Sequence, residues 1–481
     1  MSYPAVIHHG GVESVTGSCH QLDVDEYNSV LIDCGLRLDR AAVDESDSGS
    51  DIDFRHDAIR ALVVTHVHID HVGRIPQLLA AGYRGPIICS EPSLEMLMLA
   101  LEDASKHQFS QDKTQVERYL ALVRQLTVSL PFNTWQEVIK TSDVTVRIRL
   151  QRAGHILGSA YVECDILYPG GQPPKRIVFS GDLGSSHNPL LTSPASPERA
   201  DMLILESTYG DRLHEDRVSR QARLEQVIDR ALADHGTILI PAFSIGRTQE
   251  LLYEIEDILR RKALIDDGEQ TCEADSLVDW PQLPVILDSP LASRFTRVYQ
   301  KFYGYWNTAA QERLNQGRAP LSFKQLITID SHDKHLKVVN YLASTGRPAI
   351  VIAGNGMCSG GRIINYLKAM LEDARHNVVF IGYQAPGTPG AAIQSYGPLN
   401  GYVEIDRERF NINAGISTVG GYSAHADQQE LLRFVTDMNI WPEEIRLVHG
   451  ESDAKRTLGE LFKRKYSLRK TPLKLVIPPR S

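Results

Sequence analysis

The residues best suited to chemistry crowd into the run Thr-His-Val-His-Ile-Asp-His, which holds His66, His68, Asp70 and His71. The run follows Ala61–Val64, an apolar segment typical of a strand, and precedes a segment expected to be helical. A strand-to-helix loop lets several side chains converge while rigid elements hold them. Imidazole nitrogens suit zinc, and a carboxylate can bridge ions or orient a water. Three histidines and an aspartate within six residues disfavour unrelated surface or core histidines, so a metal site is predicted.

One loop cannot supply the roughly four to six ligands of a two-metal site, and three further donors follow glycine-rich or apolar runs. They are His155 in Ala-Gly-His-Ile-Leu-Gly, Asp182 after the run 177–180, and His449 after the run 445–448. The carboxyl ends of strands are where open α/β sites lie. Each residue alone is weak evidence, because a lone histidine at a strand end is more often structural. Together they complete a predicted site for two zinc ions, with manganese as an alternative.

The composition is that of a soluble globular protein without a membrane span. The chain has 481 residues, 42% hydrophobic and 23% charged, enough for roughly two to four domains. No stretch approaches the ~20 apolar residues that cross a bilayer, and residues 1–15 do not resemble a signal peptide. The six cysteines are scattered and form no Cys-x-x-Cys pair, which argues against disulfides and thiolate zinc sites. A cytoplasmic location is expected.

The charge is unevenly distributed along the chain. The formal net charge is −9, yet Lys455–Ser481 contains nine Lys or Arg and one Glu, a local net of +8 that leaves −17 for the remainder. A basic segment on an acidic protein can attract a polyanion. A solvated helix face is the equally weighted alternative.

Apolar runs divide the chain into three stretches. Strands are expected at 29–33, 61–65, 86–89 and 176–179, and helical periodicity covers 93–128. From about residue 211, apolar runs at 237–241, 285–288, 349–353 and 378–381 alternate with helical patterns at 249–261 and 293–305. That alternation predicts an α/β domain with a parallel sheet flanked by helices. The predicted boundaries are 1–210, 211–395 and 396–481. Two acidic stretches, 42–53 and 265–279, are expected to be surface loops.

The pattern His66-x-His68-x-Asp70-His71, followed by His155 and Asp182, resembles the metallo-β-lactamase superfamily. The resemblance implies a four-layer αββα sandwich with a dinuclear metal site between its sheets. Asp33, in Leu-Ile-Asp-Cys-Gly, matches the early structural aspartate of that superfamily. The resemblance implies that Asp33 supports the ligand loop and is not a metal ligand.

Three later motifs narrow the resemblance to the β-CASP nucleases. Glu206 in Leu-Glu-Ser-Thr-Tyr-Gly, His425 in Tyr-Ser-Ala-His-Ala-Asp, and His449 in Val-His-Gly-Glu resemble motifs A, B and C, with a large insertion between A and B. Histidine at motif C is typical of RNA-processing members, whereas DNA-repair members usually carry valine. The sequences of these motifs are most similar to those of the endonuclease subunit of the mRNA 3′-end cleavage complex and its bacterial and archaeal relatives.

The resemblance also implies roles for individual residues. One metal would take His66, His68, His155 and Asp182, and the other would take Asp70, His71, Asp182 and His449. Asp70 would also orient the attacking water and accept its proton. His425 would act as the general acid for the leaving oxygen, held in the right tautomer by Glu206. Hydrolysis of RNA would leave a 5′-phosphate and a 3′-hydroxyl.

Three further residues are predicted to contact RNA phosphates: Ser423, Arg247 and Arg362. A guanidinium recognises phosphate bidentately, but a turn hydroxyl and surface ion pairs are open alternatives. The expected partner is single-stranded RNA. The protein is expected to cut it as an endonuclease, with 5′→3′ exonuclease activity in addition. A homodimer is a further expectation. A small-molecule hydrolase of the lactamase or glyoxalase type, a DNA nuclease and a non-catalytic scaffold are the competing functions.

Overall fold

The computed structural model describes residues 3–37, 52–108, 113–215, 217–233, 235–268 and 282–479. The chain forms two compact units. Unit 1 comprises residues 1–213 and 424–481, and unit 2 comprises residues 214–423. The predicted surface loops at 42–53 and 265–279 lie almost wholly outside the described residues. Among the described residues, no helix combines the length and apolar character needed to cross a membrane.

Unit 1 contains two sheets built mainly from buried apolar strands. The first sheet has the order β1-β2-β3-β4-β5-β6, with β1 (Ala5–Gly10), β2 (Cys19–Asp23), β3 (Ser29–Ile32), β4 (Ile59–Val63), β5 (Ile87–Ser90) and β6 (Thr127–Leu130). The second has the order β21-β20-β11-β10-β9-β8-β7, with β7 (Trp135–Lys140), β8 (Thr145–Arg152), β9 (Ala160–Leu167), β10 (Lys175–Phe179), β11 (Met202–Glu206), β20 (Glu444–Val448) and β21 (Lys474–Val476).

The two sheets pack face to face. Since alternate residues of each strand point to opposite faces, one set of side chains lies between the sheets and the other faces outward. Val63 of β4 joins Ile177, Phe179 and Ile204 of the second sheet in one buried core. Val178, one position along β10, instead points to the outer face and packs with the last two helices. Each sheet is therefore buried on both sides, which gives four layers.

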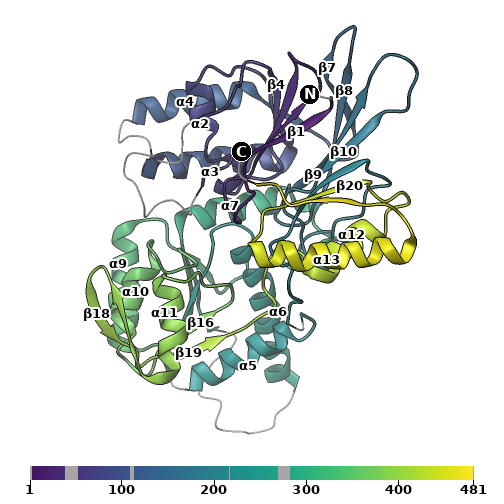
Figure 1. Cartoon of the computed structure of the whole chain (residues 1–481). Helices are drawn as coiled ribbons and strands as arrows, with labels where there is room; N and C mark the ends of the chain where they lie inside the picture. Colours follow the sequence, from purple (N-terminus) through teal and green to yellow (C-terminus); the bar gives the residue numbers. More distant parts are fainter. Residues whose placement is uncertain are drawn as a thin grey trace. The chain divides into compact units, whose positions relative to one another are not determined.

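Helices cover the outer face of each sheet in unit 1. Their bounds are α1 (Ile69–Val72), α2 (Ile75–Ala80), α3 (Glu91–Gln108), α4 (Lys113–Leu126), α12 (Gln428–Thr436) and α13 (Ser452–Arg469). In Figure 1, the yellow α13 runs beside β20, and α3 packs with α4 beside β5 and β6. The predicted αββα sandwich is thus confirmed, and its second sheet combines strands that precede unit 2 in the sequence with strands that follow it.

Unit 2 contains a parallel sheet of order β14-β13-β15-β12-β16-β19 and a separate hairpin. Its strands are β12 (Thr237–Pro241), β13 (Val285–Asp288), β14 (Leu326–Thr328), β15 (Ala349–Ala353), β16 (Asn377–Phe380), β17 (Tyr402–Ile405), β18 (Glu408–Asn411) and β19 (Gly415–Thr418). Its helices are α5 (Arg220–Ala233), α6 (Arg247–Gly268), α7 (Pro290–Lys301), α8 (Thr308–Asn315), α9 (His332–Thr345), α10 (Ile363–Met370) and α11 (Pro389–Tyr396).

The four inner strands of unit 2 are continuous apolar runs, as expected for a parallel sheet buried on both faces. The division between the units falls at residues 213 and 423, whereas the sequence placed it at 210 and 395. The difference at the second boundary has a simple cause. Strand β19 pairs in parallel with β16, from Asn377↔Gly415 to Phe380↔Thr418, so the segment up to 423 belongs to the sheet of unit 2.

Candidate metal centre and acid–base pair

The metal-ligand loop is held in shape by a buried aspartate at the end of β3. Asp33 adopts a φ of 59° and is 1% exposed. Its Oδ1 accepts the Thr65 amide at 2.8 Å, and its Oδ2 accepts the Thr65 hydroxyl at 2.8 Å and His71 Nδ1 at 2.7 Å. Because His71 Nδ1 donates to a carboxylate, Nε2 is the nitrogen that faces the centre, and it becomes an acceptor once the ring is neutral. Asp33 therefore supports the loop, as the sequence predicted.

Four residues from three segments bring one donor atom each to a first cluster. His66, His68, His155 and Asp182 place these atoms within 4.8 Å of one another. The shortest separations are 3.0 Å between His66 Nε2 and His68 Nδ1, and 3.2 Å between His155 Nε2 and His68 Nδ1. The loop carrying His155 is tied to the ligand loop, since the Ala160 amide donates to Thr65 at 2.8 Å.

Asp182 faces this cluster with one carboxylate oxygen and a second cluster with the other. Its Oδ2 lies 3.5 Å from His66 Nε2 and 3.6 Å from His155 Nε2. Its Oδ1 lies 3.3 Å from His71 Nε2 and 3.5 Å from His449 Nε2. Asp70, His71 and His449 form the second cluster. All seven ligands that the sequence predicted are thus brought together, with Asp182 between two groups.

The spacing of the donors fits two bound cations. Zinc–nitrogen bonds of 2.0–2.1 Å in tetrahedral geometry put neighbouring ligand atoms roughly 3.3 Å apart, and the shorter separations in the first cluster run from 3.0 to 3.6 Å. Among the described residues, His71 Nε2 and Asp182 Oδ1 are also buried polar atoms without a hydrogen-bond partner. Buried polar atoms of this kind call for an explanation, and a cation between them supplies one.

The pKa values of the cluster follow from burial and from its carboxylates. Burial, aided by the charge of His71, lowers the pKa of His66 well below its usual range. Burial likewise lowers the pKa of His68 to about 4. Burial opposes a proton on His71, but the Asp182 and Asp70 carboxylates outweigh it and raise its pKa well above the usual range. Neutral imidazoles are the form that binds metal, so His71 is the position where a cation must displace a proton.

Three adjacent parallel strands deliver the later site residues to one edge of the second sheet. In the register of β10 and β11, Phe179 pairs with Ile204, so Asp182 follows the end of β10 beside Glu206 at the end of β11. In the register of β11 and β20, Glu206 pairs with Val448, which puts His449 next. His449 has a φ of 47°, and its amide donates to Gly11 at 2.6 Å.

Glu206 and His425 form a hydrogen-bonded pair beside the metal clusters. His425 Nδ1 lies 3.2 Å from both Glu206 carboxylate oxygens, although the two residues are 219 positions apart. Glu206 is 1% exposed and also accepts from the Leu183 amide at 2.7 Å and the Thr208 hydroxyl at 2.6 Å. With Nδ1 directed at the carboxylate, Nε2 of His425 points toward Asp182, with 4.0 Å between Nε2 and Oδ2.

The segment that carries His425 is fixed to the loop that carries Asp182. Gly184 and His425 form a β-bridge, and the Ala426 amide donates to Leu183 at 2.7 Å. Directly afterwards Asp427 caps α12 in a reciprocal capping box with Glu430, an arrangement that stabilises a helix start. The Glu206–His425 pair is therefore built on elements of unit 1 alone, like the candidate metal ligands.

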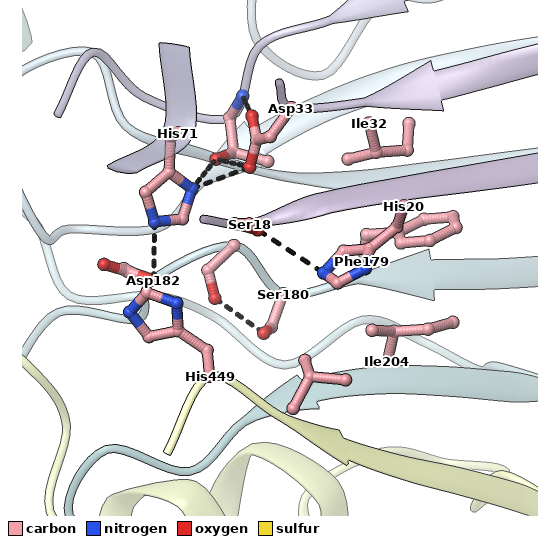
Figure 2. A pocket seen from close by; sticks show the side chains of 13 residues that line it. Ser18, His20, Ile32, Asp33, His71, Phe179, Ser180, Asp182, Ile204 and His449 are labelled. Carbon is pink, nitrogen blue, oxygen red and sulfur yellow. Dashed lines mark hydrogen bonds and ion pairs between the residues drawn. The ribbon is translucent and has the colours of Figure 1, made fainter. Parts of the chain in front are cut away.

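A small cavity lies behind the second cluster, between the two sheets. Figure 2 shows His71, Asp182 and His449 at one end and Phe179 and Ile204 at the other. Its volume is about 10 Å³, close to the room that one water molecule needs. His20, on its wall, lies 3.4 Å from the Ser18 hydroxyl through Nε2. Because the cavity is this small, the side of the clusters that faces the core has no space for a substrate.

The three residues proposed for RNA phosphates, Ser423, Arg247 and Arg362, all lie in unit 2. Arg247 pairs with Glu250 at 2.9 Å, and Arg362 donates to the buried Asp288 at 2.6 Å. Arg217 donates to the Ser423 carbonyl at 3.2 Å. Both guanidinium groups thus already bind carboxylates, and the phosphate role of all three residues stays a prediction.

Sequence reasoning missed two residues that support the site. Thr65 fastens the ligand loop to Asp33, and Thr208 donates its hydroxyl to Glu206. A signal existed for Thr208, because a threonine two positions after a carboxylate can bond to it locally. Thr65, directly before the first histidine, carried no comparable signal.

Three family models match successive parts of the chain. The metallo-beta-lactamase superfamily matches residues 24–237, the Beta-Casp domain matches residues 248–393, and the Zn-dependent metallo-hydrolase RNA specificity domain matches residues 409–472. The matched models include metallo-hydrolases, and the clustered His and Asp donors agree with them. The chain is therefore a hydrolase that uses a divalent metal.

Similar proteins cover nearly the whole chain. Ribonuclease TTHA0252 of Thermus thermophilus is 32% identical over 459 residues, which span 95% of both chains. The transcription termination factor FttA of Methanothermobacter thermautotrophicus is 29% identical over 486 residues, 97% of this chain and 70% of that protein. FttA of Methanocaldococcus jannaschii is 28% identical over 478 residues, 95% of this chain and 69% of that protein. The chain belongs to the β-CASP family of metallo-β-lactamase-fold proteins, within its RNA-processing group.

Proposed function

We propose that the protein is a zinc-dependent ribonuclease that hydrolyses phosphodiester bonds of single-stranded RNA. The observation that carries the proposal is the Glu206–His425 pair at the edge of two metal-ligand clusters that share Asp182. A proton donor beside such clusters suits a reaction whose leaving group is a poor one. Similarity to a protein named as a ribonuclease, and a matched domain named for RNA specificity, support RNA as the substrate.

The ligand assignment follows the two clusters. His66, His68, His155 and Asp182 Oδ2 would hold one ion, and Asp70, His71, His449 and Asp182 Oδ1 would hold the other. Bound divalent ions activate water and offset the charge that develops on phosphate. Histidine-rich sites with carboxylates favour zinc, and manganese remains the competing ion. Metal analysis of the purified protein should find about two zinc ions per chain, and far fewer would contradict this assignment.

The remaining steps belong to residues of this chain. Asp70 lies at the open side of the second cluster, 18% exposed, where it can orient the attacking water and accept its proton. His425 can donate a proton from Nε2 to the leaving 3′-oxygen, because Glu206 holds its Nδ1. The expected products are a 5′-phosphate and a 3′-hydroxyl.

A small-molecule hydrolase of the lactamase or glyoxalase type would share the metal ligands. Two observations favour a polymer instead. The chain carries a second α/β unit of 210 residues, 214–423, and a general-acid pair outside the ligand set. DNA is the closest alternative substrate, since the same chemistry would cleave it. A homodimer is a separate proposal, which size-exclusion chromatography with light scattering would test.

The experiment compares RNA and DNA directly. The metal-loaded protein is incubated with 5′-labelled and internally labelled single strands of each, beside a chelator-treated sample. We expect cleavage of RNA with 5′-phosphate products, no cleavage after chelation, and weaker cleavage of DNA. Cleavage of neither polymer by metal-loaded protein would overturn the proposal, and preferential cleavage of DNA would reassign the substrate. Mononucleotides released from the 5′ end would reveal 5′→3′ exonuclease activity beside internal cuts.

A further inference from the structure

The parallel sheet of unit 2 has a topological switch point between the carboxyl ends of β12 and β16. These strands are neighbours, paired at Ile238↔Asn377 and Leu239↔Val378. The chain leaves β12 through α6 toward β13, on one side of the sheet, and leaves β16 through α11 toward β19, on the other side. Where the outgoing connections of adjacent parallel strands diverge, open α/β sheets form the crevice that commonly receives a ligand.

Two exposed aromatic side chains lie in the loops at this switch point. Phe243 follows β12 and Tyr383 follows β16, and their side chains are 43% and 61% exposed. The ring of Phe243 lies on Gly356 in the loop after β15, because a Cβ built there would be 2.9 Å from its Cδ2. Gln384, next to Tyr383, donates from Nε2 to the Gly356 carbonyl at 2.9 Å. The loops after β12, β15 and β16 therefore form one continuous surface.

This surface is uncharged and presents little aliphatic area. The three loops, residues 242–246, 354–361 and 381–388, contain no Asp, Glu, Lys or Arg. The flanking Arg247 and Arg362 pair with carboxylates. Ile245 and Ile381 are buried, at 9% and 3% exposure, so the loops offer flat aromatic faces and no contiguous patch of the kind that docks a protein. A phosphate-specific site is equally disfavoured.

We infer that Phe243 and Tyr383 stack on bases of single-stranded RNA at the switch point between β12 and β16. The inference rests on the proposed function, which supplies RNA as the ligand. Aromatic side chains stack on every base, so the contact holds a strand without reading its sequence. The absence of carboxylates from the three loops means that the phosphates of the bound strand meet no like charge there.

The test uses substitutions that keep apolar volume but remove the aromatic face. Phe243→Leu and Tyr383→Leu are compared with Phe243→Tyr and Tyr383→Phe, all in the full chain carrying His425→Ala so that bound RNA persists. Tyr303, 56% exposed in a short turn of unit 2, provides the matched control Tyr303→Leu. Binding of a fluorescent 12-nucleotide RNA is measured by anisotropy, and melting temperatures confirm folding.

We expect each leucine variant at the switch point to bind RNA about 5- to 150-fold more weakly, the range for loss of one stacked base. The aromatic exchanges and Tyr303→Leu should bind like the parent. RNA with abasic sites should bind weakly to the parent and lose little more with leucine.

The outcomes separate the inference from the proposed function. Unchanged binding by both leucine variants, with RNA still cut by the wild type, overturns stacking alone. An equal loss for normal and abasic RNA also overturns it, because the residues would then act on something other than bases. A wild type that neither binds nor cuts RNA overturns both proposals.

Discussion

Replacing Glu206 with glutamine keeps the size of the side chain but removes the negative charge beside His425. The carboxylate accepts from the Leu183 amide and the Thr208 hydroxyl as well as from His425 Nδ1. In the glutamine variant the single amide oxygen must stay on the Leu183 N–H, which can only donate. The amide NH₂ group then replaces the other oxygen 3.2 Å from His425 Nδ1, and the negative charge is lost, so the imidazolium form of His425, the predicted acid, is stabilised less.

The magnitude follows from the role of the proton. General acid catalysis contributes about 10²- to 10⁴-fold to rate, which corresponds to about 3–5 kcal/mol of barrier. Glu206→Gln and His425→Ala should each lower kcat/KM on RNA by that range. Because the two residues act as one unit, the double variant should lose little more than either single variant.

The assay compares two leaving groups. RNA releases an alkoxide that needs a proton, whereas bis(p-nitrophenyl) phosphate releases a phenolate that does not, so the variants should lose less than about tenfold on the latter. Metal content must stay at the wild-type level, and His332→Ala, an exposed histidine at the start of α9, serves as a control with full activity. Equal losses on both substrates would refute the acid role and point to damage of the metal site.

Three further predictions concern the metal centre and the core. Asp182→Asn leaves one oxygen where the two clusters each use one, so bound metal should fall from about two ions to about one per chain. Elemental analysis that still finds two ions would count against Asp182 as a ligand shared by both metals. Since the pKa of His71 is raised by the Asp182 and Asp70 carboxylates despite burial, metal binding near pH 7 should release a proton and tighten as pH rises. Calorimetry in buffers of different ionisation enthalpy detects that proton, and identical heats after buffer correction would exclude it. Burial, with a smaller effect of Arg446, lowers the pKa of His8 to about 3. Between about pH 6.5 and 3, the unfolded chain therefore binds one more proton at His8 than the folded chain does. The free energy of unfolding consequently falls as the pH falls through this range. His8→Gln should reduce that slope by about 1.4 kcal/mol per pH unit in urea titrations of the metal-free protein, and an unchanged slope would place the proton elsewhere.

Local patterns in the sequence were enough to find the inner strands and the candidate metal ligands that the structure brings together. The run 237–241 became β12 with the same bounds, because a continuous apolar run has no other stable place than a buried strand. The helix predicted for residues 93–128 extends beyond the end of α4 at Leu126. Thr127–Leu130 forms β6 and pairs with β5, since pairing with a distant strand overrides local periodicity.

Contacts between distant residues could not be predicted from local pattern. Nothing local says that His425 meets Glu206, and only the resemblance to a family suggested it. The charges of unit 2 show the same limit. Arg247 and Arg362, which are predicted to contact phosphates, pair with Glu250 and Asp288, and the sequence did not predict these two pairs. Which charges pair depends on packing between segments, and a single sequence does not encode that in its spacing.

The registers of β10, β11 and β20 link the metal centre to the acid–base pair. Asp182, Glu206 and His449 end or follow three neighbouring strands, whose pairs Phe179↔Ile204 and Glu206↔Val448 fix the offsets between them. A slip of one residue would turn every side chain of β11 to the opposite face, which would move Ile204 out of the core and Glu206 away from His425 together. The apolar packing of the sandwich therefore selects the register that keeps the Glu206–His425 pair beside the predicted metal ligands, so the geometry of the proposed site and the stability of the core are coupled in this sheet.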